Sequence, residues 1–255
     1  MKTIEAAVLC GALANKFRIA DFTDHSNNGL QVASSRGCFS RVCCGVDATL
    51  PFFEEAARRG ADLLICHHGI SWGDSLKRID GLNYELVSFL IRHDIALWAC
   101  HLPLDAHPEL GNNAQICRAL GLARLAPFYR YHGETIGFRG EFAKPMPRAD
   151  FLALVRGRIS PRVSAMEFGA DAIRTVGVVS GGAADGISQA QDEGLDAYIT
   201  GEANLQSYNE CLQRHGNMYA AGHYATERFG VRAIGEWLSS EFGLAHEFVD
   251  FDIAY

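Results

Sequence analysis

Residues 60–68 read GADLLICHH, and residues 194–202 read GLDAYITGE. Both stretches open with a glycine, carry an aspartate two positions later and continue into a short run rich in apolar residues. Such runs, bounded by turn residues, predict buried strands. The match between two segments so far apart predicts that the chain contains two copies of one structural lobe.

The elements around the first copy alternate between strands and helices. Strand-like runs cover Arg41 to Val46, Ala61 to Cys66 and Ile95 to Cys100, while helical patterns cover Pro51 to Arg59 and Tyr84 to His93. This alternation predicts a mostly parallel sheet with covering helices.

The second copy repeats this order, with strands at Thr175 to Val179 and Leu195 to Thr200 and a helix from about Ile187 to Glu193. Between the copies, Thr135 to Phe142 is strand-like and Phe151 to Val155 helical. We therefore predict an α/β fold of two related lobes, each with a mostly parallel sheet and covering helices. The expected division is 1–125 for the first α/β lobe, 126–170 for a connecting segment and 171–255 for the second α/β lobe.

The composition argues against several classes of function. A chain of 255 residues with a formal charge of −7 can bury a large core but lacks the basic face that nucleic-acid binding requires. Its eight cysteines show no Cys-x-x-Cys spacing, and several, such as Cys66 and Cys100, lie within apolar runs. This pattern is typical of buried thiols in a reducing compartment, rather than of a disulfide framework or a four-thiolate zinc site.

The N-terminal segment resembles a secretion signal in its apolar character. Ala6 to Ala14 carries no charge, but Glu5 precedes it directly and its larger apolar residues fall near one face of a helix. This pattern predicts an amphipathic helix of a cytoplasmic protein. No run approaches the ~18 apolar residues of a membrane span, so we expect no membrane anchor.

Six side chains that can bind metal follow the predicted strands. They are the vicinal pair His67-His68, the His-x-x-x-acid pair His101 and Asp105, and the second such pair, His223 and Glu227. Open α/β sheets place ligand sites at the carboxyl ends of their strands, so two lobes facing each other would bring these groups together. Five of the six would suffice for two divalent metal ions, and alternation along a strand would let His67 and His68 serve different ions.

Each of these residues also has an ordinary structural explanation. A single histidine in a strand is more often a hydrogen-bonded core residue than a ligand, and an isolated His-x-x-x-Glu occurs often by chance. Burying five such groups is costly unless they are paired or bound to metal, so the set as a whole favours a dinuclear metal site. Imidazole and carboxylate donors suit Zn, Mn, Fe or Co and leave the choice among them open.

Two further features carry less weight. Gly181-Gly182 follows a strand but lacks the Gly-Lys-Ser/Thr ending of a phosphate loop, which favours a connecting turn. Trp72, Tyr208 and Tyr224 flank the donors, where they would either stack on a planar substrate or pack within the protein.

Several short motifs accompany the donors in a fixed order. They are Asn28-Gly29-Leu30-Gln31-Val32, Gly45-Val46-Asp47-Ala48-Thr49, His67-His68-Gly69, Trp72-Gly73, His101-x-x-Leu104-Asp105, Asn112-Asn113, Thr200-Gly201-Glu202 and Gly222-His223-Tyr224-x-Thr226-Glu227. Together they resemble the Nif-three-like family, whose members are often labelled GTP cyclohydrolase 1 type 2 homologues. The resemblance covers nearly the whole chain. Asn27 and Ala33 stand where the family commonly has an acidic residue and a glycine, which concerns a turn and no metal donor.

The resemblance implies two related α/β lobes around a dinuclear metal centre, usually assembled into a toroidal homohexamer in the cytoplasm. By the same resemblance, each of the five donors has an assigned place. His68 and Asp105 would hold one ion, His67 and His223 the other, and Glu227 would bridge both. His101 would lie beside the ions or carry a proton.

Two readings of the function follow. Two ions ~3.5–4 Å apart can activate a shared water, which predicts a metal-dependent hydrolase whose small-molecule substrate is unknown, with a nucleotide or phosphate ester as the candidate class. In it, His101 would protonate the leaving group, and ring opening of a purine nucleotide would need the same activated water. The alternative is a non-catalytic metal-binding protein with a regulatory, metal-handling or scaffolding role. Structural sites saturate their ligands, whereas few protein ligands per ion here favour catalysis.

Overall fold

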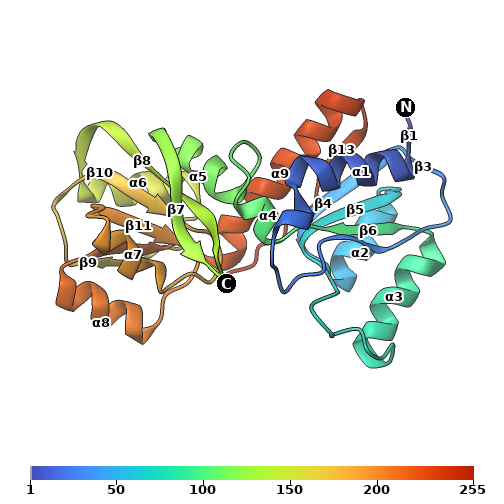
Figure 1. The fold of residues 1–255 in the computed structure, drawn as a ribbon, viewed down its shortest axis with the longest axis horizontal. Coiled ribbons are helices and arrows are strands. Elements are labelled where there is room, and N and C mark those ends of the chain that lie inside the picture. The colour runs from blue at the N-terminus through green and yellow to red at the C-terminus, as the bar shows by residue number, and fades with distance from the viewer. Residues whose placement is uncertain (1) are drawn as a thin grey trace. The chain divides into compact units, whose positions relative to one another are not determined.

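The computed structural model of the chain describes residues 2–255, which form two compact units (Figure 1). Unit 1 combines residues 2–104 with Gly230–Phe251, and unit 2 combines Asp105–Phe229 with Asp252–Tyr255. The units therefore do not simply follow one another along the chain. The last helix, α9 (His223–Phe242), begins in unit 2 and ends in unit 1.

Unit 1 is built on a five-stranded sheet in the order β13-β4-β5-β6-β2. Its strands are β2 (Gly29–Val32), β4 (Arg41–Asp47), β5 (Leu63–His68), β6 (Ala96–Ala99) and β13 (Ala245–Phe248). Strands β13, β4, β5 and β6 run parallel, and β2 pairs antiparallel at the edge. The mostly parallel sheet predicted for the first lobe is confirmed.

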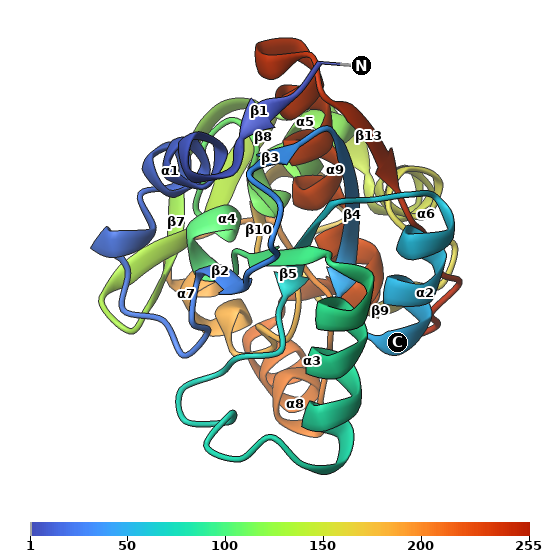
Figure 2. The ribbon, with the colours of Figure 1, turned by 90° about the vertical axis from the view of Figure 1, so that its right-hand side faces the viewer.

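Helices cover both faces of this sheet, with α2 and α3 together on one face and α1 on the other (Figure 2). The remaining elements of unit 1 are β1 (Ile4–Glu5), α1 (Ala6–Phe17), the 3₁₀ helix η1 (Ile19–Asp21), β3 (Cys38–Phe39), α2 (Leu50–Arg58), α3 (Gly81–His93) and α4 (Leu102–Asp105), whose last residue belongs to unit 2. Cys43, Leu64 and Leu97 pack in one cluster with α2 and α3. The next residue of β6, Trp98, meets Phe17 of α1 with ring centroids 6.0 Å apart. Because both faces are covered, the inner strands β4, β5 and β6 each carry a continuous buried apolar run.

Unit 2 is built on a six-stranded sheet in the order β7-β8-β10-β11-β12-β9. Its strands are β7 (Ala123–Tyr131), β8 (Glu134–Pro147), β9 (Ser164–Glu167), β10 (Ala172–Val178), β11 (Ala197–Thr200) and β12 (Asn217–Ala220). Strands β10, β11 and β12 run parallel, while β7, β8 and β9 pair antiparallel. This sheet is therefore mixed, where the sequence predicts a mostly parallel one.

The segment expected to be a connection, 126–170, supplies the antiparallel part of this sheet. Strands β7 and β8 form a hairpin across His132 and Gly133, whose φ angles of 49° and 91° are both positive. Positive φ at both residues is the geometry of a tight two-residue hairpin turn. The strand over 135–142 is confirmed and extended, but β7 lies half exposed at the sheet edge and lacks the continuous apolar run of a buried strand.

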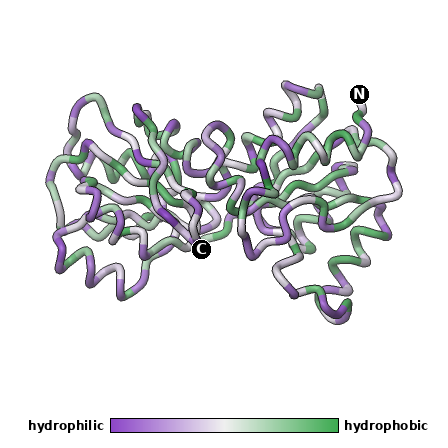
Figure 3. Tube along the Cα trace, in the orientation of Figure 1, coloured by the Kyte–Doolittle hydropathy of each residue, from purple (hydrophilic) through white to green (hydrophobic). Residues whose placement is uncertain are grey.

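The core of unit 2 lies between its sheet and two of its helices. Unit 2 contains α5 (Asn112–Leu120), α6 (Arg148–Arg158), α7 (Gly186–Asp192) and α8 (Leu205–Arg214), and the two that cover this core are α5 and α6. Ile116 of α5 and Phe151 of α6 pack in one cluster with Val176, Ile199 and Tyr219 of the sheet. Hydrophobic residues accordingly run along the inner strands of each unit, and hydrophilic residues gather in the loops (Figure 3).

The two units share an internal order of elements, β4-α2-β5-α3-β6 in unit 1 and β10-α7-β11-α8-β12 in unit 2. In each unit the three strands are parallel neighbours. The matching aspartates make matching contacts. The backbone N–H of Arg41 donates to the Asp62 carboxylate at 3.1 Å and that of Thr175 donates to Asp196 at 2.8 Å. In return the N–H of each aspartate donates to the carbonyl of Arg41 or Thr175.

The remaining sequence expectations concern the termini, the thiols and the membrane. Helix α1 buries Leu9, Leu13 and Phe17, which confirms the predicted amphipathic helix. All eight cysteines are free thiols, and six of them are buried. Among residues 2–255, no helix combines the length and apolarity needed to cross a bilayer.

Candidate metal centre

Three histidines gather at the carboxyl ends of strands in unit 1. His67 and His68 end β5, and His101 follows β6. Each histidine contributes one ring nitrogen to a group of three nitrogen atoms that all lie within 4.8 Å of one another. The expected alternation of His67 and His68 does not hold, since their ring centroids are 4.7 Å apart. His68 is the last residue of β5 and is still paired with Asp47 of β4, yet its ring lies beside that of His67.

Each of these imidazoles has its Nδ1 bonded to an oxygen of the protein. The pairs are His67 with the carbonyl of Cys100 at 2.9 Å, His68 with Asp47 at 2.7 Å and His101 with Asp24 at 3.0 Å. Because these oxygens accept, Nδ1 donates, and Nε2 of the neutral ring keeps its lone pair. This arrangement is characteristic of metal-binding histidines.

Asp24, which was not among the residues predicted from the sequence, holds the ring of His101. Its side chain is 2% exposed and accepts from the backbone N–H of Ser26 and Leu102 and from Asn28, as well as from His101. Burial opposes the charge, but the hydrogen bond and charge of His101 and the further donors outweigh it and lower the pKa of Asp24 to about 2. The signal in the sequence is weak, because an aspartate in a polar turn is ordinary.

Unit 2 contains the other three predicted residues. His223 and Glu227 lie one turn apart at the start of α9, with Nε2 of His223 3.1 Å from Oε1 of Glu227. Nδ1 of His223 donates to Glu202, a residue that the sequence analysis placed in a motif but gave no role. Burial disfavours the charged ring, yet Glu227 and Glu202 outweigh it and raise the pKa of His223 to about 9. A metal ion bound at Nε2 would have to replace that proton.

Asp105 is held in the same unit by polar neighbours from two other elements. It is 5% exposed, and its Oδ1 accepts from Asn112 Nδ2 at 2.9 Å and from Ser180 Oγ at 3.1 Å. Asn113 supports the same loop by accepting from the backbone N–H of Ser180 at 2.6 Å. The Asn112-Asn113 motif therefore fixes a buried carboxylate at the point where α5 begins.

The turn at Gly181 makes room for the donors of α9. Gly181 has a φ of 68°, and a Cβ there would lie 2.4 Å from Oε1 of Glu227 and 3.2 Å from Nε2 of His223. Its backbone N–H donates to Oγ1 of Thr226 at 3.0 Å, and its carbonyl accepts from Thr200 at 3.1 Å. The predicted connecting turn is present, and it serves to pack the backbone against Glu227.

The three flanking aromatic residues differ in their surroundings. The Trp72 ring lies 5.0 Å from that of His101 and 5.8 Å from that of His68, measured between centroids, and its Nε1 donates to the carbonyl of Gly69. Tyr224 is buried, and Tyr208 packs edge-on against Phe168. Trp72 therefore packs against two of the histidines of unit 1.

The donors of both units fit a divalent metal. Imidazole nitrogens fixed through Nδ1 and nearly buried carboxylates are the ligand chemistry of Zn, Mn, Fe and Co sites. The structure brings His67, His68 and His101 together in unit 1 and His223 and Glu227 together in unit 2, with Asp105 in the same unit. Fold and residues define a class of two-unit α/β proteins with histidine and carboxylate groups at the ends of parallel strands.

Comparisons with known proteins place the chain within this class. The family Duf34/NIF3 (NGG1p interacting factor 3) matches residues 5–253, and the chain belongs to it. A protein of Deinococcus radiodurans named GTP cyclohydrolase 1 type 2 homolog is 39% identical over 239 residues, which cover 94% of this chain and 90% of that protein. An Escherichia coli protein of the same name is 35% identical over 236 residues, covering 92% and 93%.

Solved structures agree with this assignment. A protein described as ybgI, of unknown function, matches with a TM-score of 0.92 and 33% identity over 99% of this chain and 100% of that chain. TTHA1606 from Thermus thermophilus matches with a TM-score of 0.88 and 34% identity over the same shares. The fold predicted from the family resemblance is confirmed.

Proposed function

We propose that the chain binds two divalent metal ions and uses them to hydrolyse a small molecule, such as a nucleotide or another phosphate ester. The main support for this proposal is that Nδ1 of each of the four histidines in the candidate site is hydrogen-bonded to a protein oxygen. Core histidines have no need of this shared arrangement, whereas metal ligands do. The name GTP cyclohydrolase 1 type 2 homolog belongs to relatives and supports nucleotides as a substrate class only by likeness.

We assign the ligands from the family resemblance. His68 and Asp105 would hold one ion, His67 and His223 would hold the other, and Glu227 would serve both. Five protein ligands for two ions leave coordination positions for water and substrate. Two carboxylates and neutral imidazoles offset only part of the charge of two divalent ions, so the site would keep a net positive charge that favours a bound hydroxide and an anionic substrate.

The protein's own residues would supply orientation and proton transfer. Two bound ions would lower the pKa of a shared water and polarise the bond to be cut. Asp24 fixes the Nδ1 hydrogen of His101, so Nε2 of His101 is the atom that would exchange a proton with the leaving group. Glu202 orients His223 in the same way, and Trp72 limits the rotation of the His101 ring.

Turnover by metal-loaded and chelator-stripped protein tests this function. We expect hydrolysis of at least one member of a panel of phosphate esters and nucleotides, including GTP, that is lost on stripping and restored by Zn, Mn, Fe or Co. Glu227→Gln should abolish turnover, while Glu236→Gln, farther along α9, should leave it unchanged. Turnover that survives stripping would refute the metal mechanism. Two bound ions without turnover on any substrate would favour the non-catalytic metal-binding alternative.

We also infer from the resemblance that the chain works as a homohexamer in the cytoplasm. Sedimentation or light scattering at micromolar concentration should give the mass of six chains. A monomer mass under those conditions would contradict this inference.

A further inference from the structure

A cavity of about 400 Å³ in unit 2 lies at the carboxyl ends of β11 and β12. Residues that follow these strands, Gly201, Glu202 and Gly222, line it together with Arg162, Ser164 and Tyr255. Its volume falls within the range of small-molecule sites, and the carboxyl ends of parallel strands are where open α/β sheets bind ligands.

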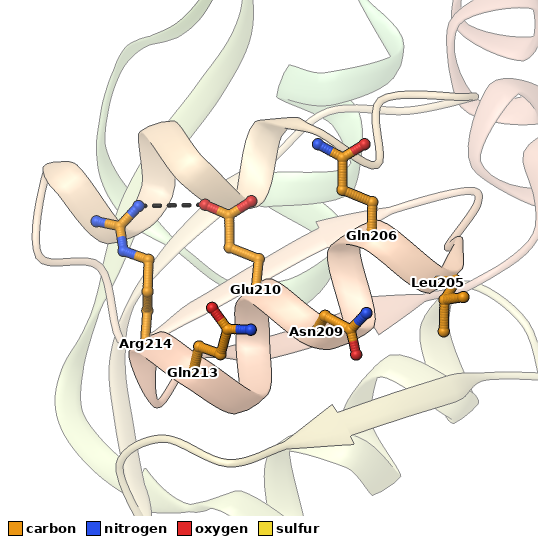
Figure 4. A pocket seen from close by; sticks show the side chains of 6 residues that line it. All are labelled: Leu205, Gln206, Asn209, Glu210, Gln213 and Arg214. Carbon is orange, nitrogen blue, oxygen red and sulfur yellow. Dashed lines mark hydrogen bonds and ion pairs between the residues drawn. The ribbon is translucent and has the colours of Figure 1, made fainter.

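A larger groove in the same unit lacks these features. It measures about 680 Å³ and is lined by side chains of α8 alone, including Leu205, Gln206 and Arg214 (Figure 4). Arg214, its cation, is paired with Glu210 and Asp192. None of the candidate metal donors lies in it, so the smaller cavity is the better substrate site.

Glu202 connects the smaller cavity with the candidate metal centre. Its carboxylate accepts from Nδ1 of His223, and the same side chain lines the cavity. A ligand in the cavity would therefore lie one side chain away from a proposed metal ligand. Among the residues that line the cavity, Arg162 is the cation.

Arg162 is held by a contact that an anion could replace. Its Nη2 lies 2.6 Å from Oδ1 of Asp252, but the two side chains are 51% and 87% exposed. An ion pair this exposed adds at most about 1 kcal/mol to stability. The guanidinium fork binds carboxylates and phosphates alike, so the Asp252 carboxylate occupies the position of a ligand oxyanion.

The short segment 252–255, which contributes Tyr255 to the cavity lining, is held in place at both of its ends. Asp252 is tied to Arg162, and the carbonyl of Tyr255 accepts from the backbone N–H of Tyr224 at 3.1 Å. Tyr255 is 74% exposed, so its ring is accessible to an aromatic ligand.

We propose that this cavity binds the oxyanion of a small molecule, a phosphate monoester or a carboxylate, through Arg162, with Tyr255 against its planar part. That this molecule is the substrate rests on the proposed hydrolase function. Binding itself involves residues outside the metal ligands. The two claims can therefore fail separately.

Binding to the chelator-stripped full chain tests the cavity without any metal chemistry. Phenyl phosphate, benzoate and inorganic phosphate would be titrated by calorimetry or NMR, which distinguishes a phosphate from a carboxylate site. We expect saturable binding that falls about tenfold or more in Arg162→Gln, because a charge-assisted bidentate contact is lost. Asp252→Asn should bind more tightly, because the competing carboxylate is gone.

Arg174→Gln is the matched control, since Arg174 is 48% exposed and paired with Glu141 outside the cavity. It should bind like the wild type. Equal affinity in the wild type and Arg162→Gln, or no saturable binding by the wild type, would overturn the proposal. Binding that depends on Arg162 in a protein without any turnover would support the cavity and count against the hydrolase function.

Discussion

At the scale of single residues, the candidate site depends on carboxylates that hold histidines. Asp24, Asp47 and Glu202 each accept a hydrogen bond from an Nδ1, a role that the sequence alone predicts for none of them. The donors themselves stood out because they follow strands in a repeated pattern. Their partners did not, because Asp24 meets His101 across 77 positions of the chain. Glu202 had a visible signal, as it aligns with His68 in the repeat, and Asp47 lies in one of the short motifs.

Replacing Glu202 by glutamine tests the support of His223. The amide keeps the shape but removes the charge that holds the ring, so metal affinity should fall roughly 10–100-fold, as for other outer partners of metal ligands. Competition with a chromophoric chelator would measure this. Glu193→Gln, at an exposed ion pair with Arg139 in the same unit, should change little. Unchanged affinity in Glu202→Gln would show that the contact has no part in metal binding.

Asp24 predicts a pH dependence of stability. Its pKa falls from 3.8 to about 2 on folding, so its contribution is present above pH ~4 and is lost as pH falls towards 2. Asp24→Asn should lower the free energy of unfolding by about 2 kcal/mol near neutral pH, and the difference should shrink below pH ~4. Urea unfolding at several pH values would measure it. A constant difference down to pH ~2 would argue against this origin. The exposed Asp74→Asn is the control.

A comparison of alanine substitutions at Gly181 and Gly194 separates the effect of backbone strain from that of contact with the candidate site. Both have φ of 68°, but a Cβ at Gly194 would meet nothing within 4 Å, whereas at Gly181 it would meet Glu227. Each alanine variant should lose about 1 kcal/mol of stability through left-handed strain. Only Gly181→Ala should also lose metal affinity, measured by calorimetric titration. Equal metal affinity in the two variants would contradict the packing of Gly181 against Glu227.

At the scale of elements, the parallel part of each sheet was predictable and the antiparallel part was not. The buried strands β4, β5, β10 and β11 are short apolar runs between helices, a pattern that depends on local sequence. The edge strand β7 is half exposed, and its pairing with β8 depends on the turn at His132 and Gly133. Gly133 is typical of such a turn, but the residue before it is usually Asn, Asp or Gly, and here it is His132.

Substitutions of the matching aspartates, Asp62 and Asp196, test whether the two copies of the repeat are stabilised by equivalent contacts. Asp62→Ala and Asp196→Ala each remove a carboxylate that accepts from a backbone N–H of a neighbouring strand, that of Arg41 in β4 or of Thr175 in β10. Each substitution should lower the free energy of unfolding by about 1–3 kcal/mol, because the backbone N–H groups lose their acceptor. Urea unfolding would measure both losses. A loss in one variant alone would mean that the two contacts are not equivalent.

At the scale of the whole molecule, the chain passes between the units close to the candidate donors. Asp105 is the first residue of unit 2, and Glu227 lies on the helix that continues into unit 1. This order along the chain could not be read from the sequence, which suggested lobes that follow one another. A metal ion that binds only the folded state would stabilise that state by mass action, so chelation should lower the temperature or urea midpoint of unfolding. Glu227→Gln should respond little to chelation, and an equal response in both proteins would contradict this linkage.

The number of metal ions per chain tests the central claim most directly. Elemental analysis of protein reloaded with one metal and freed of excess should give about two ions per chain in the wild type. His223→Ala should retain about one, because the ligands assigned to the other ion remain. A wild-type ratio of one or less, or a ratio of two that His223→Ala and His68→Ala both leave unchanged, would contradict the dinuclear site.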